Sequence, residues 1–190
     1  MGRSTYLVRS PDRLCRWSGI WPEWLWILKK QAAAFNNAAK GCPFLLLTDL
    51  DQHACPPDLI TDWLDRPKHA HFLLRVAVRE IESWLLGDLT GLNAYFGLRR
   101  SFTLPNPEAL PDPKEELLKL AMMCPSRHIR EALVWRDDEK GRLRQGPDYN
   151  GTLARFVVQR WDIGAAKLAC RSLGRLFVAL QQLEAHFQRR

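Results

Sequence analysis

Two short apolar runs, each followed by a pair of acidic residues, constrain the fold of this chain more than any other feature. The first run is Phe44-Leu-Leu-Leu-Thr-Asp49-Leu-Asp51, and the second is Phe72-Leu-Leu-Arg-Val-Ala-Val-Arg-Glu80-Ile-Glu82. Each has the length of a strand, which predicts strands at about 43–48 and about 72–78. The first run does not alternate with polar residues, so we expect that strand to be buried on both faces.

The segment between these runs predicts a helix. Pro57-Asp-Leu-Ile-Thr-Asp-Trp-Leu64 has apolar residues at helical spacing, and Pro57 suits the first turn. Strand, helix, strand is a βαβ unit with parallel strands, whose ligands bind beyond the carboxyl ends. We therefore expect one sheet edge to collect four acidic residues, Asp49, Asp51, Glu80 and Glu82.

Four carboxylates at one edge would repel one another unless a cation lay between them. Mg²⁺ or Mn²⁺ prefers carboxylate oxygens and keeps positions open for water and phosphate. We expect the second acidic pair to begin a helix at roughly Arg79 to Asp88. Glu80 in its first turn would also be favoured by the helix dipole alone. On such a helix Glu82 lies about 200 degrees from Glu80. Glu80 is therefore the favoured ligand and a catalytic residue that would complete the metal shell or polarise water, and Glu82 is an outer, catalytic-site residue.

The rest of the chain predicts mainly helices, packed with the sheet into one domain of residues 1–190. Asp112-Pro-Lys-Glu115 is a helix start with Asp112 as N-cap, and Ser126 is a second N-cap. Charged residues from Trp135 to Gln145 indicate an exposed segment. Further helices are expected at about 23–39, 126–134, 150–160 and 162–187.

The chain carries a formal net charge of +7, which suits a phosphate-rich partner such as DNA or RNA, although many ordinary proteins are as basic. Arg171 and Arg175 lie one helical turn apart and form a candidate nucleic-acid contact. A solvated helix face is the alternative for these arginines. Lys114 is a third candidate phosphate contact, although helix capping explains most of its segment.

Five scattered cysteines without a metal-binding spacing indicate reduced thiols. The sequence has neither a signal-peptide pattern nor an apolar stretch of membrane-spanning length. We therefore expect a cytoplasmic protein that does not interact with a membrane.

Several separated motifs resemble the DUF4276 family of uncharacterised bacterial proteins. They are Thr48-Asp-Leu-Asp51, Cys55-Pro-Pro, Arg75-Val-Ala-Val-Arg-Glu80-Ile-Glu82-Ser-Trp84-Leu-Leu-Gly-Asp88, Leu110-Pro-Asp-Pro-Lys114, Gly146-Pro-Asp-Tyr149-Asn and Ser172-Leu-Gly-Arg175. The resemblance covers about residues 35–183. That family is similar to the Toprim-like group, which has a small parallel sheet between helices and a DxD motif with glutamates around Mg²⁺.

The resemblance implies a function. The Toprim-like group includes topoisomerase and primase domains and nucleases of phage-defence systems, which often act beside an ATPase partner. Asp49 and Asp51 would match the DxD motif, and Glu80 would be a further metal ligand. We therefore expect a Mg²⁺-dependent nuclease or phosphodiesterase.

One departure from that pattern leaves alternatives open. Toprim-like domains usually begin with a strand that ends in a catalytic glutamate, whereas Met1–Ile20 contains no acid except Asp12. Either the chain starts late, or the protein is a degenerate binding or partner subunit that does not cut. In a third interpretation, Asp49 and Asp51 serve only as helix caps and loop formers.

Overall fold

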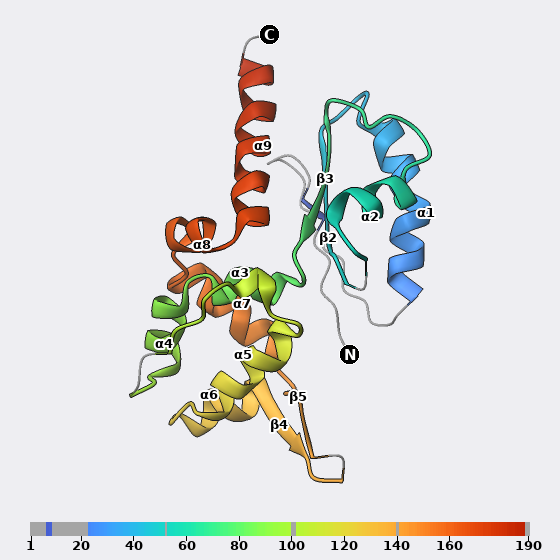
Figure 1. The fold of residues 1–190 in the computed structure, drawn as a ribbon. Helices are drawn as coiled ribbons and strands as arrows, with labels where there is room; N and C mark the ends of the chain where they lie inside the picture. The colour runs from blue at the N-terminus through green and yellow to red at the C-terminus, as the bar shows by residue number, and fades with distance from the viewer. Residues whose placement is uncertain (1–6, 9–22, 52, 100–101, 140, 189–190) are drawn as a thin grey trace. The chain divides into compact units, whose positions relative to one another are not determined.

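The computed structural model describes residues 7–8, 23–51, 53–99, 102–139 and 141–188, so Asp12 lies outside the described residues. The chain divides into two compact units (Figure 1). Unit 1 comprises residues 1–78 and 175–190, and unit 2 comprises residues 79–174. Each unit is described by itself, and the single domain of residues 1–190 stays a prediction.

Unit 1 contains the predicted βαβ motif. Strand β2 pairs with β3 in parallel, with Phe44 opposite Phe72 and Asp49 opposite Ala77, and the strand β1 pairs with β2 antiparallel. The elements are β1 (Leu7–Val8), α1 (Glu23–Ala38), β2 (Phe44–Asp49), α2 (Pro56–Trp63) and β3 (Phe72–Ala77). The predicted strand, helix and parallel strand are therefore confirmed, in a mixed α/β fold.

Helices α1 and α2 lie on the same side of β2 and β3 (Figure 1). They form the core of unit 1 with alternate strand residues, which include Leu46, Phe72, Leu74 and Val76. Leu45 and Leu47 point to the other face and are only half-buried. The prediction that β2 is buried on both faces is therefore wrong for the face of Leu45 and Leu47, because α1 and α2 cover only the opposite face.

Unit 2 is mainly helical and has an antiparallel strand pair of its own, β4 with β5. Helix α9 begins in unit 2 and continues into unit 1. The elements are α3 (Ile81–Leu86), α4 (Leu89–Phe96), the 3₁₀ turn η1 (Pro107–Ala109), α5 (Pro113–Met122), α6 (Arg127–Leu133), β4 (Val134–Asp137), β5 (Arg142–Gln145), α7 (Tyr149–Gln159), α8 (Ile163–Ala169) and α9 (Arg171–Gln188).

Two of the helix starts with a side-chain cap, those at Asp112 and Ser126, were predicted correctly. The Asp112 carboxylate accepts a hydrogen bond from the Glu115 amide at 2.7 Å, and the Ser126 hydroxyl accepts one from the Ile129 amide at 3.5 Å. These caps satisfy amides that the first helical turn leaves without partners. A local sequence signal was sufficient here because the donor and acceptor are three residues apart.

The described residues of the segment from Trp135 to Gln145 are exposed or half-buried, as predicted, and the segment forms the β4–β5 hairpin, which the sequence did not indicate. One prediction in the C-terminal half was wrong. The helix expected at 162–187 is interrupted at Cys170, which has an extended backbone. The Glu108 carboxylate accepts hydrogen bonds from the Arg171 and Ser172 amides at 3.0 and 2.8 Å, so a new helix begins there.

The core of unit 2 is formed by apolar residues from α3 to α7, among them Leu86, Leu92, Phe96, Leu117, Leu133 and Phe156. Full burial of a leucine or phenylalanine side chain contributes about 1.5–3 kcal/mol. This core holds the starts of α3, α5 and α7 in place. None of the helices in the described part of the chain combines the length and apolarity needed to cross a bilayer.

Asp88 joins two distant parts of unit 2. Its carboxylate accepts a hydrogen bond from the Gly91 amide at 2.9 Å, which caps α4, and one from the Asp162 amide at 2.8 Å. Asp88 is 3 % exposed, so water cannot readily replace these acceptors. The Asp162 side chain in turn caps α8 by accepting from the amides of Gly164 and Ala165.

We predict that Asp88→Ala lowers the free energy of unfolding by about 2–3 kcal/mol, because two amides lose a buried charged acceptor. Asp112→Ala removes an exposed N-cap and serves as the control, with an expected loss of about 1 kcal/mol. Urea unfolding followed by circular dichroism measures both. Equal losses in the two variants would contradict a linking role for Asp88.

Candidate functional site

The DxD pair lies at the carboxyl end of β2, in unit 1. Asp49 is the last residue of the strand and is 6 % exposed. The Leu50 amide donates to the Ala77 carbonyl at 2.9 Å, which carries the strand pairing one residue further. Both aspartates therefore occupy the edge at which an open α/β sheet binds ligands.

Asp51 has a left-handed backbone, with φ of 59°. Few residues other than glycine adopt this conformation, and aspartate tolerates it better than most. The chain turns here, and the His53 amide donates to the Leu50 carbonyl at 3.1 Å. The turn alone thus gives a structural reason for an aspartate at position 51, which agrees with the loop-former interpretation without excluding a ligand role.

Glu80 and Glu82 lie at the start of α3, in unit 2. The helix begins at Ile81, two residues later than the sequence indicates, and Glu80 is its N-cap with an extended backbone (φ −136°, ψ 164°). The expected start at Arg79 is therefore wrong. Because Glu80 precedes the helical turns, the angle of about 200 degrees between the two glutamates does not apply. Both carboxylates can face the same group.

That group is the Lys114 ammonium. Its Nζ lies 3.9 Å from Glu80 Oε1 and 3.4 Å from Glu82 Oε1. The side chains of Lys114, Glu80 and Glu82 are 15 %, 16 % and 5 % exposed. Lys114 comes from the first turn of α5, directly after Pro113, so the Asp112 cap also fixes the backbone that presents the ammonium.

Tyr149 completes this arrangement and was missed from the sequence. Its hydroxyl donates a hydrogen bond to Glu82 Oε1 at 2.9 Å, and the residue is 4 % exposed. Burial raises the pKa of the Tyr149 phenol well above its ordinary value, and the negative charges of Glu82 and Glu80 raise it further. Tyr149 therefore stays protonated and acts as a fixed donor. We call Glu80, Glu82, Lys114 and Tyr149 the glutamate cluster.

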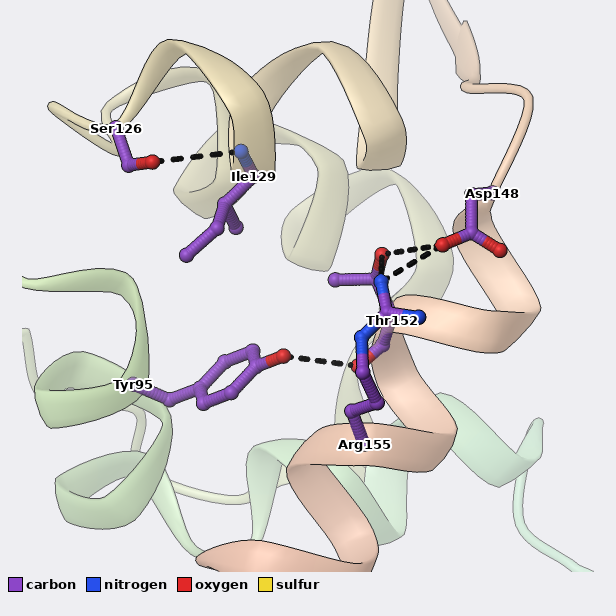
Figure 2. A network of polar contacts seen from close by, with 6 residues as sticks. All are labelled: Tyr95, Ser126, Ile129, Asp148, Thr152 and Arg155. Atoms are coloured by element: carbon purple, nitrogen blue, oxygen red, sulfur yellow. Dashed lines mark hydrogen bonds and ion pairs between the residues drawn. The ribbon is translucent and has the colours of Figure 1, made fainter.

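A polar network joins Asp148, Thr152 and Arg155 at the start of α7 (Figure 2). The Arg155 guanidinium donates to Asp148 Oδ2 at 2.7 Å, and the Thr152 hydroxyl donates to the same oxygen at 3.1 Å. These hydrogen bonds, that of Arg155 first, lower the pKa of the Asp148 carboxyl. The Tyr95 hydroxyl donates to the Thr152 carbonyl at 3.2 Å and links the first two turns of α7 to α4.

The glutamate cluster has two carboxylates and one ammonium, which leaves one negative charge uncompensated among its own groups. Glu82 Oε2 is buried and accepts no hydrogen bond among the described residues. Mg²⁺ usually binds one or two protein carboxylates and completes its shell with water and phosphate oxygens. By donor chemistry, Glu80 and Glu82 therefore fit a hard divalent cation.

The described residues contain no group of three or more histidine, cysteine, aspartate or glutamate side chains placed to hold a metal ion. Asp49 and Asp51 belong to unit 1, whereas Glu80 and Glu82 belong to unit 2. The convergence of all four acids at one edge stays a prediction.

The three predicted nucleic-acid contacts lie in different environments. Arg171 and Arg175 are exposed and one turn apart on α9, as expected. Lys114 is largely buried against the two glutamates. Its ammonium is therefore in a position to serve a ligand of the glutamate cluster, and Arg171 and Arg175 are open to solvent.

None of the protein-family models, curated proteins and solved structures compared with this chain matches it. The resemblance to the DUF4276 family therefore rests on the sequence motifs alone. Three of these motifs, those that contain Glu80 and Glu82, Lys114, and Tyr149, meet in the glutamate cluster.

We predict that Lys114→Met lowers the free energy of unfolding by about 2–3 kcal/mol, because it leaves two poorly solvated carboxylates without their ammonium. The matched control is Lys119→Met on the same helix. Lys119 is 51 % exposed and pairs with Glu115 and Glu116, so a loss of about 0.5 kcal/mol is expected.

Addition of Glu82→Gln to Lys114→Met should recover part of that loss, since it removes one of the two carboxylate charges. Thermal and urea unfolding of the two single variants and the double variant measure these effects. A Lys114→Met protein as stable as the Lys119→Met protein would show that the ion pairs contribute nothing.

Proposed function

We propose that this chain is a divalent-cation-dependent phosphodiesterase that acts on DNA or RNA, built on a Toprim-like scaffold. The observation that carries the proposal is the glutamate cluster, in which two buried carboxylates, one ammonium and one tyrosine hydroxyl converge from α3, α5 and α7. Such a set of fixed charges is costly to fold and stable only when its members are paired. Clusters of this kind are frequent at functional sites.

Each member of the cluster has a role in the proposal. Glu80 is the more exposed carboxylate and would ligate Mg²⁺ or Mn²⁺ directly. Glu82, held by the Tyr149 hydroxyl at 2.9 Å and by Lys114 at 3.4 Å, would orient and extend that ligand shell. We keep Asp49 and Asp51 as predicted ligands on the strength of their position at the end of β2.

The cation, when bound, would neutralise charge on the scissile phosphate and activate water. Lys114 would then be free to turn its ammonium toward a phosphate oxygen, since the cation takes over part of its interaction with the glutamates. Tyr149 keeps its proton at neutral pH, because its pKa is raised, and so continues to hold Glu82 in one orientation. The net charge of +7 supports a polyanionic substrate.

A second candidate function is a non-catalytic binding subunit on the same scaffold. It is favoured by the Lys114 ammonium, which lies within ion-pair distance of both glutamates and so supplies the positive charge that a metal ion would otherwise bring. The lack of a three-residue ligand group among the described residues also favours it. Such a subunit would bind nucleic acid and form no product.

A cleavage assay separates the two functions. The full chain is incubated with single- and double-stranded DNA and RNA in Mg²⁺, in Mn²⁺ or in EDTA. We predict cleavage that requires the cation and falls roughly 100-fold or more in Glu80→Gln and in Asp49→Ala. Glu115→Gln changes an exposed glutamate and should leave the rate unaltered.

Cleavage that persists in EDTA, or that is the same in Glu80→Gln as in the unaltered chain, would contradict the proposed site. Nucleic acid bound without any product, under every cation condition, would instead support the binding subunit.

A further inference from the structure

A cluster of positive charge lies on one face of the sheet of unit 1. Arg75 is in the middle of β3, opposite Leu47 of β2. Its neighbours Leu74 and Val76 belong to the core beneath α1 and α2, so Arg75 projects to the other face of the sheet. An arginine at the centre of a sheet face is unusual, because that position commonly holds an apolar residue.

The Arg75 side chain is half-buried and incompletely satisfied. Its Nε atom is buried and donates to no acceptor, although a guanidinium carries five N–H donors. Within unit 1, no described acidic side chain lies within ion-pair distance of Arg75. Asp62 and Asp65, two acids of unit 1, pair with Lys29, His53 and Arg66.

Helix α9 brings a second arginine to this face. The His71 ring, at the start of β3, lies 5.0 Å from the His186 ring and 4.8 Å from the Phe187 ring. Arg175 precedes His186 by about 16 Å along the helix, at about 1.5 Å per residue. Arg75 follows His71 by about 13 Å along the strand, at about 3.3 Å per residue. With α9 antiparallel to β3, Arg175 therefore comes close to Arg75.

The electrostatics of Arg75 and Arg175 agree with this geometry. Burial lowers the pKa of the Arg75 guanidinium, and the positive charge of Arg175 lowers it further. Burial likewise lowers the pKa of Lys68, with a further contribution from Arg75. Like charges held together in this way destabilise a fold unless an anion compensates them.

We propose that Arg75 and Arg175 form a binding site for a phosphate group, with Arg75 at its base and the exposed Arg175 at its rim. Arginine suits this ligand because its planar N–H groups match two phosphate oxygens at once. The phosphate belongs either to a nucleic-acid backbone or to a free phosphate ion. If the phosphate belongs to a nucleic-acid backbone, the inference rests on the proposed function. The phosphate site itself does not depend on that function.

Asp49 supports a link between this site and the sheet edge. Asp49 and Arg75 share one face of the β2–β3 pair, because Leu47 is opposite Arg75 and Asp49 is two residues beyond Leu47. A phosphate on Arg75 would therefore lie on the same face of the sheet as Asp49.

The test is a binding experiment on the full chain in EDTA, so that no cleavage contributes. A fluorescently labelled single-stranded DNA oligonucleotide is titrated and followed by anisotropy at several salt concentrations. Stabilisation by inorganic phosphate is measured separately from the thermal unfolding midpoint. The variants are Arg75→Gln and Arg175→Gln, and the control is Arg66→Gln, whose side chain is 79 % exposed in the same unit.

We expect Arg75→Gln and Arg175→Gln each to weaken oligonucleotide binding about tenfold and to reduce the salt slope by about one. Arg66→Gln should leave both unchanged. Loss of phosphate stabilisation with unaltered oligonucleotide affinity would support the site with a free phosphate as its ligand. If neither ligand is affected in Arg75→Gln and in the exposed Arg175→Gln, both still folded, the site is overturned.

The two proposals fail separately. Weakened binding in the arginine variants of a chain that never cleaves nucleic acid would leave the phosphate site standing and remove the phosphodiesterase. Cation-dependent cleavage with unaltered binding in these variants would support the phosphodiesterase and remove the phosphate site.

Discussion

The ion pairs between the Lys114 ammonium and the carboxylates of Glu80 and Glu82 are the interaction on which the arrangement of unit 2 depends. Three helix starts meet there, since Glu80 and Glu82 come from α3, Lys114 from α5 and Tyr149 from α7. Apolar packing of these helices supplies the energy to bring them together, and it has no preference for charged groups at the junction. Four polar groups at such a point are therefore better explained by function than by stability.

Local signals in the sequence were enough for much of the fold. Pro57 and the apolar spacing after it predicted α2, and two apolar runs predicted the parallel strands β2 and β3. Asp112 and Ser126 predicted helix starts because a cap and its amide are three residues apart. In each case the interacting groups are neighbours in the chain, or the pattern repeats with the period of the element.

Interactions between distant residues could not be predicted in the same way. Tyr149 reaches Glu82 across 67 positions, and its motif indicated no more than a tight turn. Glu108 caps α9 from 63 residues away, so nothing near Cys170 indicated that the helix stops there. Glu80 was predicted in the first turn of α3, whereas it is the N-cap, because the helix begins two residues later than predicted. The sequence thus named Glu80, Glu82 and Lys114 as candidates, and it did not indicate how they are arranged around one another.

The charge of the chain is distributed unevenly within each unit. Unit 1 places Arg75 and Arg175 on one face, where Arg75 Nε has no acceptor, and unit 2 holds two glutamates against one lysine. Each arrangement gathers charge of one sign, negative in the glutamate cluster and positive around Arg75. A polyanion together with a divalent cation would compensate both, which is why we favour a phosphodiester substrate over a protein partner.

The central claim is that the glutamate cluster holds a divalent cation. Calorimetric titration of Mn²⁺ into the purified chain tests it without the need to know the substrate. We predict saturable binding that is lost or weakened at least tenfold in Glu82→Gln and retained in Glu116→Gln, which changes a glutamate outside the cluster on α5. Binding that is equally strong in Glu82→Gln, or no binding to the unaltered chain, would contradict the account.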